Sequence, residues 1–87
     1  MISKKLMLEN ETGLHARPAT ELAKIAMKYP CQVTMSFGDK KINVKSPLMI
    51  MSAGIKTKTE LEIICDGEKE EEALNEIIEA FNNNFGE

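Results

Sequence analysis

The sequence predicts a two-layer α+β sandwich in which helices cover one side of a half-polar sheet. Strand-like and helix-like segments alternate along the chain in the order βαββαβα, with no linker between them. Two of the helical segments are amphipathic, and apolar residues alternate with polar ones in the strands, so each element has one face to bury. This pattern alone also permits a ferredoxin-like topology, which has a similar order of elements.

The first half of the chain predicts a strand, a helix and a β-hairpin. We expect the strand at about residues 2–8 and the helix from about Ala16 to Lys28, ended by Pro30. Gly38-Asp39 is typical of a turn between the two strands of the hairpin. The apolar positions expected to be buried here are Ile2, Leu6, Leu8, Ala19, Leu22, Ala23, Ala26, Val33, Met35, Phe37, Ile42 and Val44.

The second half predicts a short helix, a fourth strand and a last helix. Ser46-Pro47 opens the short helix, because serine is a favoured N-cap and proline a favoured first residue, and Gly54 ends it. The strand is expected over Thr59–Cys65, and Asp66-Gly67 turns the chain into a helix over about residues 69–84. The apolar stripes here consist of Leu61, Ile63, Cys65, Ala73, Leu74, Ile77, Ile78, Phe81 and Phe85.

Length and composition limit the classes of protein to consider. The 87 residues predict one domain spanning residues 1–87, and 43% hydrophobic residues are typical of a globular chain. A net charge of −3 and the lack of tryptophan argue against a nucleic-acid partner. No apolar run approaches the roughly 20 residues that cross a bilayer, and Met1–Lys5 has no apolar secretory segment. We therefore expect a cytoplasmic protein that binds neither nucleic acid nor membrane.

The two cysteines, Cys31 and Cys65, are expected to be small buried apolar residues. They form no Cys-x-x-Cys motif, and the chain has a single histidine to join them in a metal site. A reducing compartment disfavours a disulfide between them. We expect neither a metal site nor a disulfide.

The only histidine, His15, is expected where a loop turns into a helix. Gly13 loosens the backbone before it, and Pro18 is tolerated only in the first turn of a helix. Free backbone N–H groups, the helix dipole and the guanidinium of Arg17 then surround one imidazole, which predicts an anion site with a nucleophile inside it. The dipole disfavours the imidazolium form, whereas the nearby carboxylates of Glu9 and Glu11 favour it.

The stretch Gly-Leu-His-Ala-Arg-Pro-Ala, residues 13–19, resembles the active-site motif of HPr, the histidine-containing phosphocarrier of the bacterial phosphoenolpyruvate-dependent sugar phosphotransferase system. Residues 43–46 and 51–54 resemble a second segment of the family, and the likeness covers essentially the whole chain. The resemblance implies a four-stranded antiparallel sheet covered on one face by three helices. It also implies that His15 is phosphorylated to phosphohistidine, that Arg17 stabilises the phosphate, and that no cofactor or metal is needed.

The partners that the resemblance implies are enzyme I, which donates the phosphoryl group, and enzyme IIA proteins, which receive it. Such a carrier is a phosphoryl-transfer intermediate with no independent catalytic turnover, and we expect a monomer. Four apolar residues in a row, 48–51, cannot all be buried by a short helix, so a docking surface is expected there. The residues expected to contact partners are Thr20, Lys24, Met27, Pro47, Leu48, Met51 and Ser52.

Ser46 has two interpretations at this point. It is either only a helix cap or also a regulatory site for a serine kinase/phosphorylase, as the resemblance implies. The chain departs from the family's usual pattern here, with Pro47 and Met49 beside the serine. The alternative to a sugar-transport carrier is a related regulatory protein that controls a non-sugar pathway.

Overall fold

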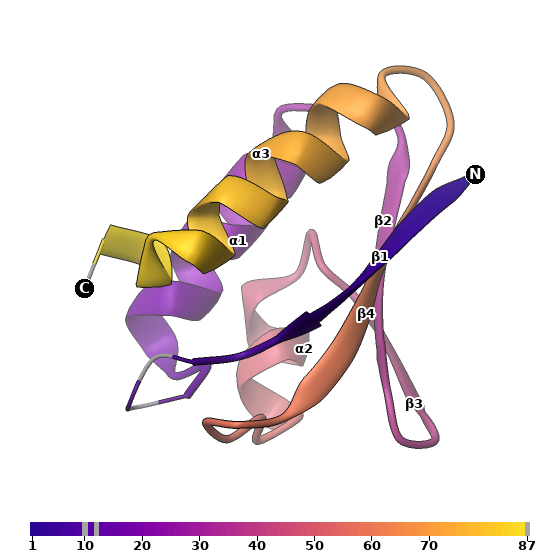
Figure 1. The fold of residues 1–87 in the computed structure, drawn as a ribbon. Coiled ribbons are helices and arrows are strands. Elements are labelled where there is room, and N and C mark those ends of the chain that lie inside the picture. The colour runs from indigo at the N-terminus through magenta and orange to yellow at the C-terminus, as the bar shows by residue number, and fades with distance from the viewer. Residues whose placement is uncertain (10, 12, 87) are drawn as a thin grey trace.

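A four-stranded sheet forms one layer of the structure and helices form the other (Figure 1). The computed structural model describes residues 1–9, 11 and 13–86. The strands are β1 (Ile2–Met7), β2 (Gln32–Phe37), β3 (Lys40–Asn43) and β4 (Glu60–Asp66). The helices are α1 (Ala16–Met27), α2 (Pro47–Ser52) and α3 (Glu70–Asn82), followed by a 3₁₀ turn, η1 (Asn84–Gly86). The predicted α+β class and βαββαβα order are confirmed.

The strands lie in the order β1-β4-β2-β3, and every neighbouring pair is antiparallel. β4 is an interior strand, and its Ile63 lies opposite Lys4 of β1 on one side and Met35 of β2 on the other. In the ferredoxin-like order the third strand lies between the first two, whereas here the fourth strand does and β1 is at the edge. The structure therefore excludes the ferredoxin-like alternative.

The first two helices begin and end where local chemistry predicts. Pro18 lies in the first turn of α1. Ser46 caps α2, since its hydroxyl accepts a hydrogen bond from the Met49 N–H at 3.3 Å, and Pro47 is the first helical residue. Gly54 follows the end of α2 with a φ of +63°, a left-handed conformation that favours glycine.

One apolar core lies between the sheet and the helices. Alternate residues of β2 and β4 point into it, and Met35 and Ile63 are 0% exposed. The apolar positions predicted to be buried lie in this core or are half-buried against it, as Phe37 and Ile78 are. Among the described residues, no helix combines the length and the apolar character needed to cross a membrane.

The two cysteines are free thiols within this core. Cys31 is 1% exposed and Cys65 is 0% exposed, as expected of small apolar residues. Burial, and secondarily the neighbouring Cys31, raises the pKa of the Cys65 thiol to about 11. Both side chains therefore contribute to packing, and Cys65 does so as a protonated thiol.

The last helix is shorter than the sequence predicts. The expected range was about 69–84, but Lys69 is left-handed with a φ of 64°, and α3 ends at Asn82. Asn84 and Phe85 are left-handed too, and the turn folds the Phe85 ring against Phe81 edge to face, with centroids 4.9 Å apart. Phe85 is buried as expected, but it reaches the core through this turn rather than along the helical stripe.

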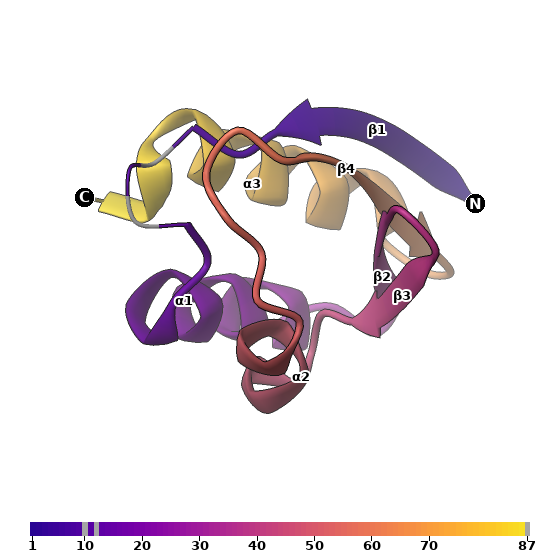
Figure 2. The same ribbon diagram turned by 90° about the horizontal axis from the view of Figure 1, so that it is seen from below.

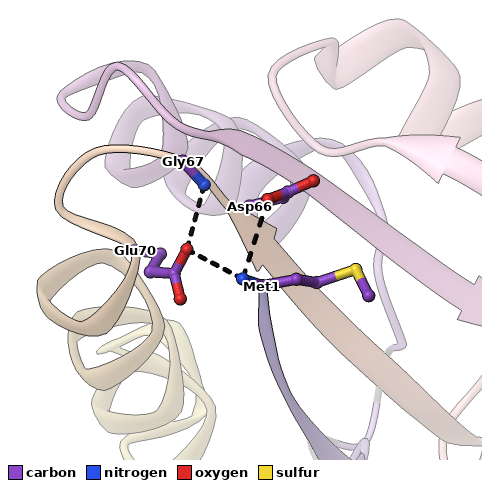
Figure 3. Close-up of polar contacts among 4 residues, drawn as sticks. All are labelled: Met1, Asp66, Gly67 and Glu70. Atoms are coloured by element: carbon purple, nitrogen blue, oxygen red, sulfur yellow. Dashed lines mark hydrogen bonds and ion pairs between the residues drawn. The ribbon is translucent and has the colours of Figure 1, made fainter.

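Two groups of polar contacts join distant parts of the chain. At the start of β1, the Met1 ammonium lies 3.1 Å from the Glu70 carboxylate, which also accepts a hydrogen bond from the Gly67 N–H at 3.0 Å (Figure 3). Asp66 lies 3.7 Å from the same ammonium. The Gly67 hydrogen bond and the Met1 ammonium together lower the pKa of Glu70.

The second group links the end of α1 to α3. The Tyr29 hydroxyl donates a hydrogen bond to the Glu76 carboxylate, and the Lys28 ammonium pairs with it. The bond to Glu76, followed by desolvation, raises the pKa of Tyr29 to about 12. Lys28 and then Tyr29 lower the pKa of Glu76.

Candidate functional site

His15 lies at the N-cap of α1, where extended backbone turns into helix. Its φ and ψ are −84° and −165°, and its carbonyl accepts the first helical hydrogen bond, from the Ala19 N–H at 2.9 Å. The imidazole is exposed and does not cap the helix. The predicted position at a helix N-terminus is confirmed, and the ring is accessible to a large partner.

The first turn of α1 presents positive charge beside this imidazole. The backbone N–H groups of Ala16 and Arg17 have no intrahelical partner, and the helix dipole adds a partial positive charge. Arg17 is exposed, and its guanidinium makes no ion pair or hydrogen bond with any other residue that the structure describes. The guanidinium is therefore available to bind an incoming anion.

A hollow of about 440 Å³ opens beside His15, and we call it the histidine hollow. It lies between the segment that enters α1 and the segment that leaves α2, which run side by side in Figure 2. The Leu14 N–H donates a hydrogen bond to the Ile55 carbonyl at 3.0 Å and joins the two segments. The residues that line the hollow are Glu11, Leu14, His15, Met51, Gly54, Ile55, Lys56 and Thr57.

Gly13 allows these two segments to touch. Its φ is +72°, and a Cβ atom there would lie 2.6 Å from the Ile55 carbonyl oxygen and 3.1 Å from the Lys56 Cα. A side chain at this position would therefore push the two backbones apart. The glycine that begins the motif is explained by close packing as well as by its left-handed conformation.

Two charged residues share the hollow with His15, and they were not distinguished by sequence reasoning. Glu11 lines it, whereas Glu9, the other carboxylate near the histidine in sequence, does not. Lys56, from a distant part of the chain, also lines it. No local pattern singles out Lys56, because its position depends on the pairing of the loop around Ile55 with Leu14.

Residues expected to contact partners lie on α1 and α2, which pack beside each other (Figure 2). On α1, Lys24 and Met27 are exposed, whereas Thr20 is half-buried and its hydroxyl donates to the Ala16 carbonyl at 2.7 Å. Lys24 lies 3.8 Å from Glu21 in a surface ion pair. These α1 side chains extend from the histidine along the exposed face of the helix.

On α2, three of the four consecutive apolar residues are exposed. Leu48 is 69% exposed, Met49 45% and Met51 37%, whereas Ile50 is fully buried. The prediction that a short helix cannot bury all four is confirmed. Pro47 is half-buried at the first position of the helix, and Ser52 is exposed at its last. We call the exposed residues Leu48, Met49, Met51 and Ser52 the α2 patch.

The α2 patch connects two hollows. Met51 lines the histidine hollow, and Leu48 and Met49 line a groove of about 450 Å³ with Lys40 and Lys41 of β3. Ser46 caps the start of the six-residue α2, whereas Met51, which lines the histidine hollow, lies near the end of that helix. Within the described part of the chain, no three His, Cys, Asp or Glu side chains gather to hold a metal ion.

Known proteins resemble this chain over nearly its whole length. A family model described as the PTS HPr component phosphorylation site matches residues 2–83. HPr-C-His from Thermoanaerobacter tengcongensis is 34% identical with a TM-score of 0.95, and the match covers 100% of this chain and 98% of that one. The histidine-containing phosphocarrier protein of Mycoplasma is 33% identical with a TM-score of 0.90, over 95% and 96% of the two chains. Bacillus subtilis Crh, solved as a swapped dimer, is 33% identical with a TM-score of 0.76, over 97% of each chain.

Proposed function

Because this chain belongs to the HPr family of phosphocarrier proteins, we propose that His15 accepts a phosphoryl group from phospho-enzyme I and passes it to enzyme IIA proteins of sugar transport. The observation that carries the proposal is the exposed imidazole at the N-cap of α1, close in sequence to the exposed guanidinium of Arg17. A nucleophile and an anion site coincide there.

The transfer step exchanges one P–N bond for another. An unprotonated ring nitrogen of His15, Nδ1 by resemblance to the family, attacks phosphorus. The bond to the donor's histidine breaks, and its electron pair stays on the donor ring. No electron acceptor or cofactor is needed for this exchange. The N–H groups and dipole at the start of α1 stabilise the phosphoryl group while it is carried.

The function is tested by incubation with phosphoenolpyruvate and enzyme I, followed by intact-mass measurement. The expected result is one phosphoryl group per chain that is lost in acid and retained in base, as P–N bonds are. His15→Ala should abolish the label and leave the fold intact, because the side chain is exposed. Label that is stable in acid, or that persists in this variant, would overturn the proposal.

Arg17 has a role in transfer rather than in folding. A charge-assisted hydrogen bond from its guanidinium to a phosphoryl oxygen contributes about 1.5–3 kcal/mol. Arg17→Ala should therefore slow phosphoryl transfer by about tenfold or more, since ~1.4 kcal/mol corresponds to a factor of ten. Thermal unfolding supplies the control: a loss of stability that accounts for the loss of rate would assign Arg17 a structural role instead.

The docking surface for enzyme I and the enzyme IIA proteins combines the α2 patch with Thr20, Lys24, Met27 and Pro47. Exposed methionines adapt to differently shaped partners, which suits a carrier that must meet several proteins. Met51 lines the histidine hollow, so a partner bound to the α2 patch also covers the site of transfer. The carrier acts as a cytoplasmic monomer with no nucleic-acid or membrane partner.

Ser46 is a regulatory site within the same surface. A phosphate added there by a serine kinase/phosphorylase would lie at the start of α2, where the helix terminus tolerates negative charge. It would then stand beside the α2 patch and repel an acidic partner without changing the fold. Pro47 and Met49, which differ from the family's usual residues, alter the shape that a kinase must bind.

A second candidate function is regulation of another pathway, favoured by the likeness to Crh, a protein described as acting in catabolite repression. Both candidates take phosphate at His15, so the label does not separate them. Transfer from the phosphorylated chain to purified enzyme IIA proteins does, because only the sugar-transport carrier should pass its phosphoryl group to them at a useful rate.

A further inference from the structure

One residue that lines the histidine hollow is a lysine, Lys56, to which the function proposed above assigns no role. Lys56 lines it together with His15, although the two residues come from different segments of the chain. Arg17, the other cation near the histidine, does not line this hollow. Lys56 and Arg17 are thus two basic residues near the histidine that belong to different segments, and only Lys56 lines the hollow.

The backbone that carries Lys56 is held firmly against the residues before His15. The hydrogen bond from the Leu14 N–H to the Ile55 carbonyl joins the two segments. His15 directly follows Leu14 in the chain, and Lys56 directly follows Ile55. The close approach of Gly13 to the Lys56 Cα leaves no room for this loop to move inward. The separation between the Lys56 and His15 backbones is thus set by main-chain contacts rather than by flexible side chains.

No carboxylate among the described residues neutralises the charge of Lys56 through an ion pair. The side chain is exposed, and its ammonium forms no ion pair with a carboxylate in the part of the chain that the structure describes. Glu11 lines the same hollow and forms no ion pair with Lys56. One lysine and one glutamate thus line the hollow, and a phosphoryl group there would attract the first side chain and repel the second.

We propose that Lys56 is a second cation for the phosphoryl group carried on His15, and that Glu11, which lines the same hollow, opposes it. The inference rests on the proposed function, because it concerns the phosphorylated state of His15. In this arrangement Arg17 and Lys56 stabilise the phosphoryl group, and Glu11 limits that stability, so that the group can still be passed on.

The test is a competition for one phosphoryl group. A heavy-isotope-labelled parent protein is mixed with an equal amount of unlabelled variant, catalytic enzyme I and less phosphoenolpyruvate than total carrier. Enzyme I equilibrates the phosphoryl group between the two proteins, and intact-mass measurement gives its distribution. The ratio reports the relative stability of the phosphorylated forms and is independent of how tightly enzyme I binds either one.

Lys56→Gln should shift the distribution toward the parent by about two- to fivefold, the effect of one partly screened charge. Glu11→Gln should shift it toward the variant by a similar factor. Lys58→Gln is the matched control, since Lys58 is an exposed lysine of the same loop that does not line the hollow. The shifts should shrink at high salt, because screening weakens charge interactions near the surface.

Each outcome decides between the two proposals. The inference is supported by opposite shifts for Lys56→Gln and Glu11→Gln and by equal phosphorylation of Lys58→Gln and the parent. A purely structural role would not reverse with the sign of the removed charge. A distribution for Lys56→Gln that equals that of Lys58→Gln overturns the inference and leaves His15 as the carrier. A parent protein that takes up no label overturns the proposed function and the inference with it.

Discussion

Gly13 and Gly54 form a matched pair that tests how the histidine hollow is built. Both are left-handed, with φ of +72° and +63°. A Cβ atom at Gly54 would meet nothing within 4 Å, whereas one at Gly13 would lie 2.6 Å from the Ile55 carbonyl oxygen. Substitution by alanine therefore adds the same conformational strain at both positions and a backbone clash at Gly13 alone.

The expected losses of stability follow from these two contributions. An alanine in the left-handed region costs about 1–2 kcal/mol, and its reduced freedom in the unfolded chain offsets about 0.4–1 kcal/mol. Gly54→Ala should thus lower the free energy of unfolding by about 1 kcal/mol. Gly13→Ala must also separate two backbones by several tenths of an ångström, and overpacking of this kind costs about 1–3 kcal/mol. Its total should reach about 2–4 kcal/mol.

Urea unfolding of the parent and both variants, followed by circular dichroism, measures this difference. Thermal unfolding provides a second scale, since 1 kcal/mol shifts the Tm of a domain of this size by about 4–8 °C. Gly13→Ala should also shift the Leu14 amide resonance, because its hydrogen bond to Ile55 must lengthen. Equal losses for the two variants, with the Leu14 resonance unmoved, would falsify the close contact described above.

Three further predictions concern the docking surface, the cap of α2 and pH dependence. Leu48→Glu should weaken enzyme I binding at least tenfold in calorimetry, whereas Met7→Glu, an exposed methionine on the sheet, should not. Ser46→Ala should lower the free energy of unfolding by about 0.5–2 kcal/mol, whereas Ser46→Asp should keep the cap and reduce phosphorylation by enzyme I. Tyr29, the single tyrosine, should ionise near pH 12 by ultraviolet absorbance, and Glu76→Gln should return its pKa toward 10. Because folding raises this pKa, the protonated hydroxyl contributes fully to the free energy of unfolding below about pH 10, and this contribution is lost as pH rises toward 12. An unchanged tyrosine titration in Glu76→Gln would contradict the assigned contact.

Much of the fold could be predicted from the sequence because its signals are local. The N-cap at Ser46, the left-handed glycine after α2 and the periodic burial of Leu61 and Ile63 depend on residues a few positions apart. The position of His15 at the start of α1 follows in the same way from the neighbouring Pro18. Each of these features was predicted correctly.

The features that sequence reasoning missed depend on distant contacts or on unfavourable backbone conformations. The strand order, and with it the choice against a ferredoxin-like topology, is set by the pairing of β4 with both β1 and β2. Left-handed Lys69 and Phe85 shorten α3, although neither residue type favours that conformation. Lys56 lines the same hollow as His15 because Gly13 and Leu14 contact the loop around Ile55.

The two buried thiols make the molecule convenient to label. Cys31 and Cys65 are almost completely shielded from solvent, and the pKa of about 11 keeps Cys65 in its unreactive protonated form. A maleimide dye should therefore react with a cysteine introduced at exposed Met49 without prior removal of the native ones. Because the chain contains no tryptophan, emission excited at long ultraviolet wavelengths would come from a bound partner alone. Energy transfer from that partner's tryptophans to the dye would follow docking in real time on an otherwise native carrier.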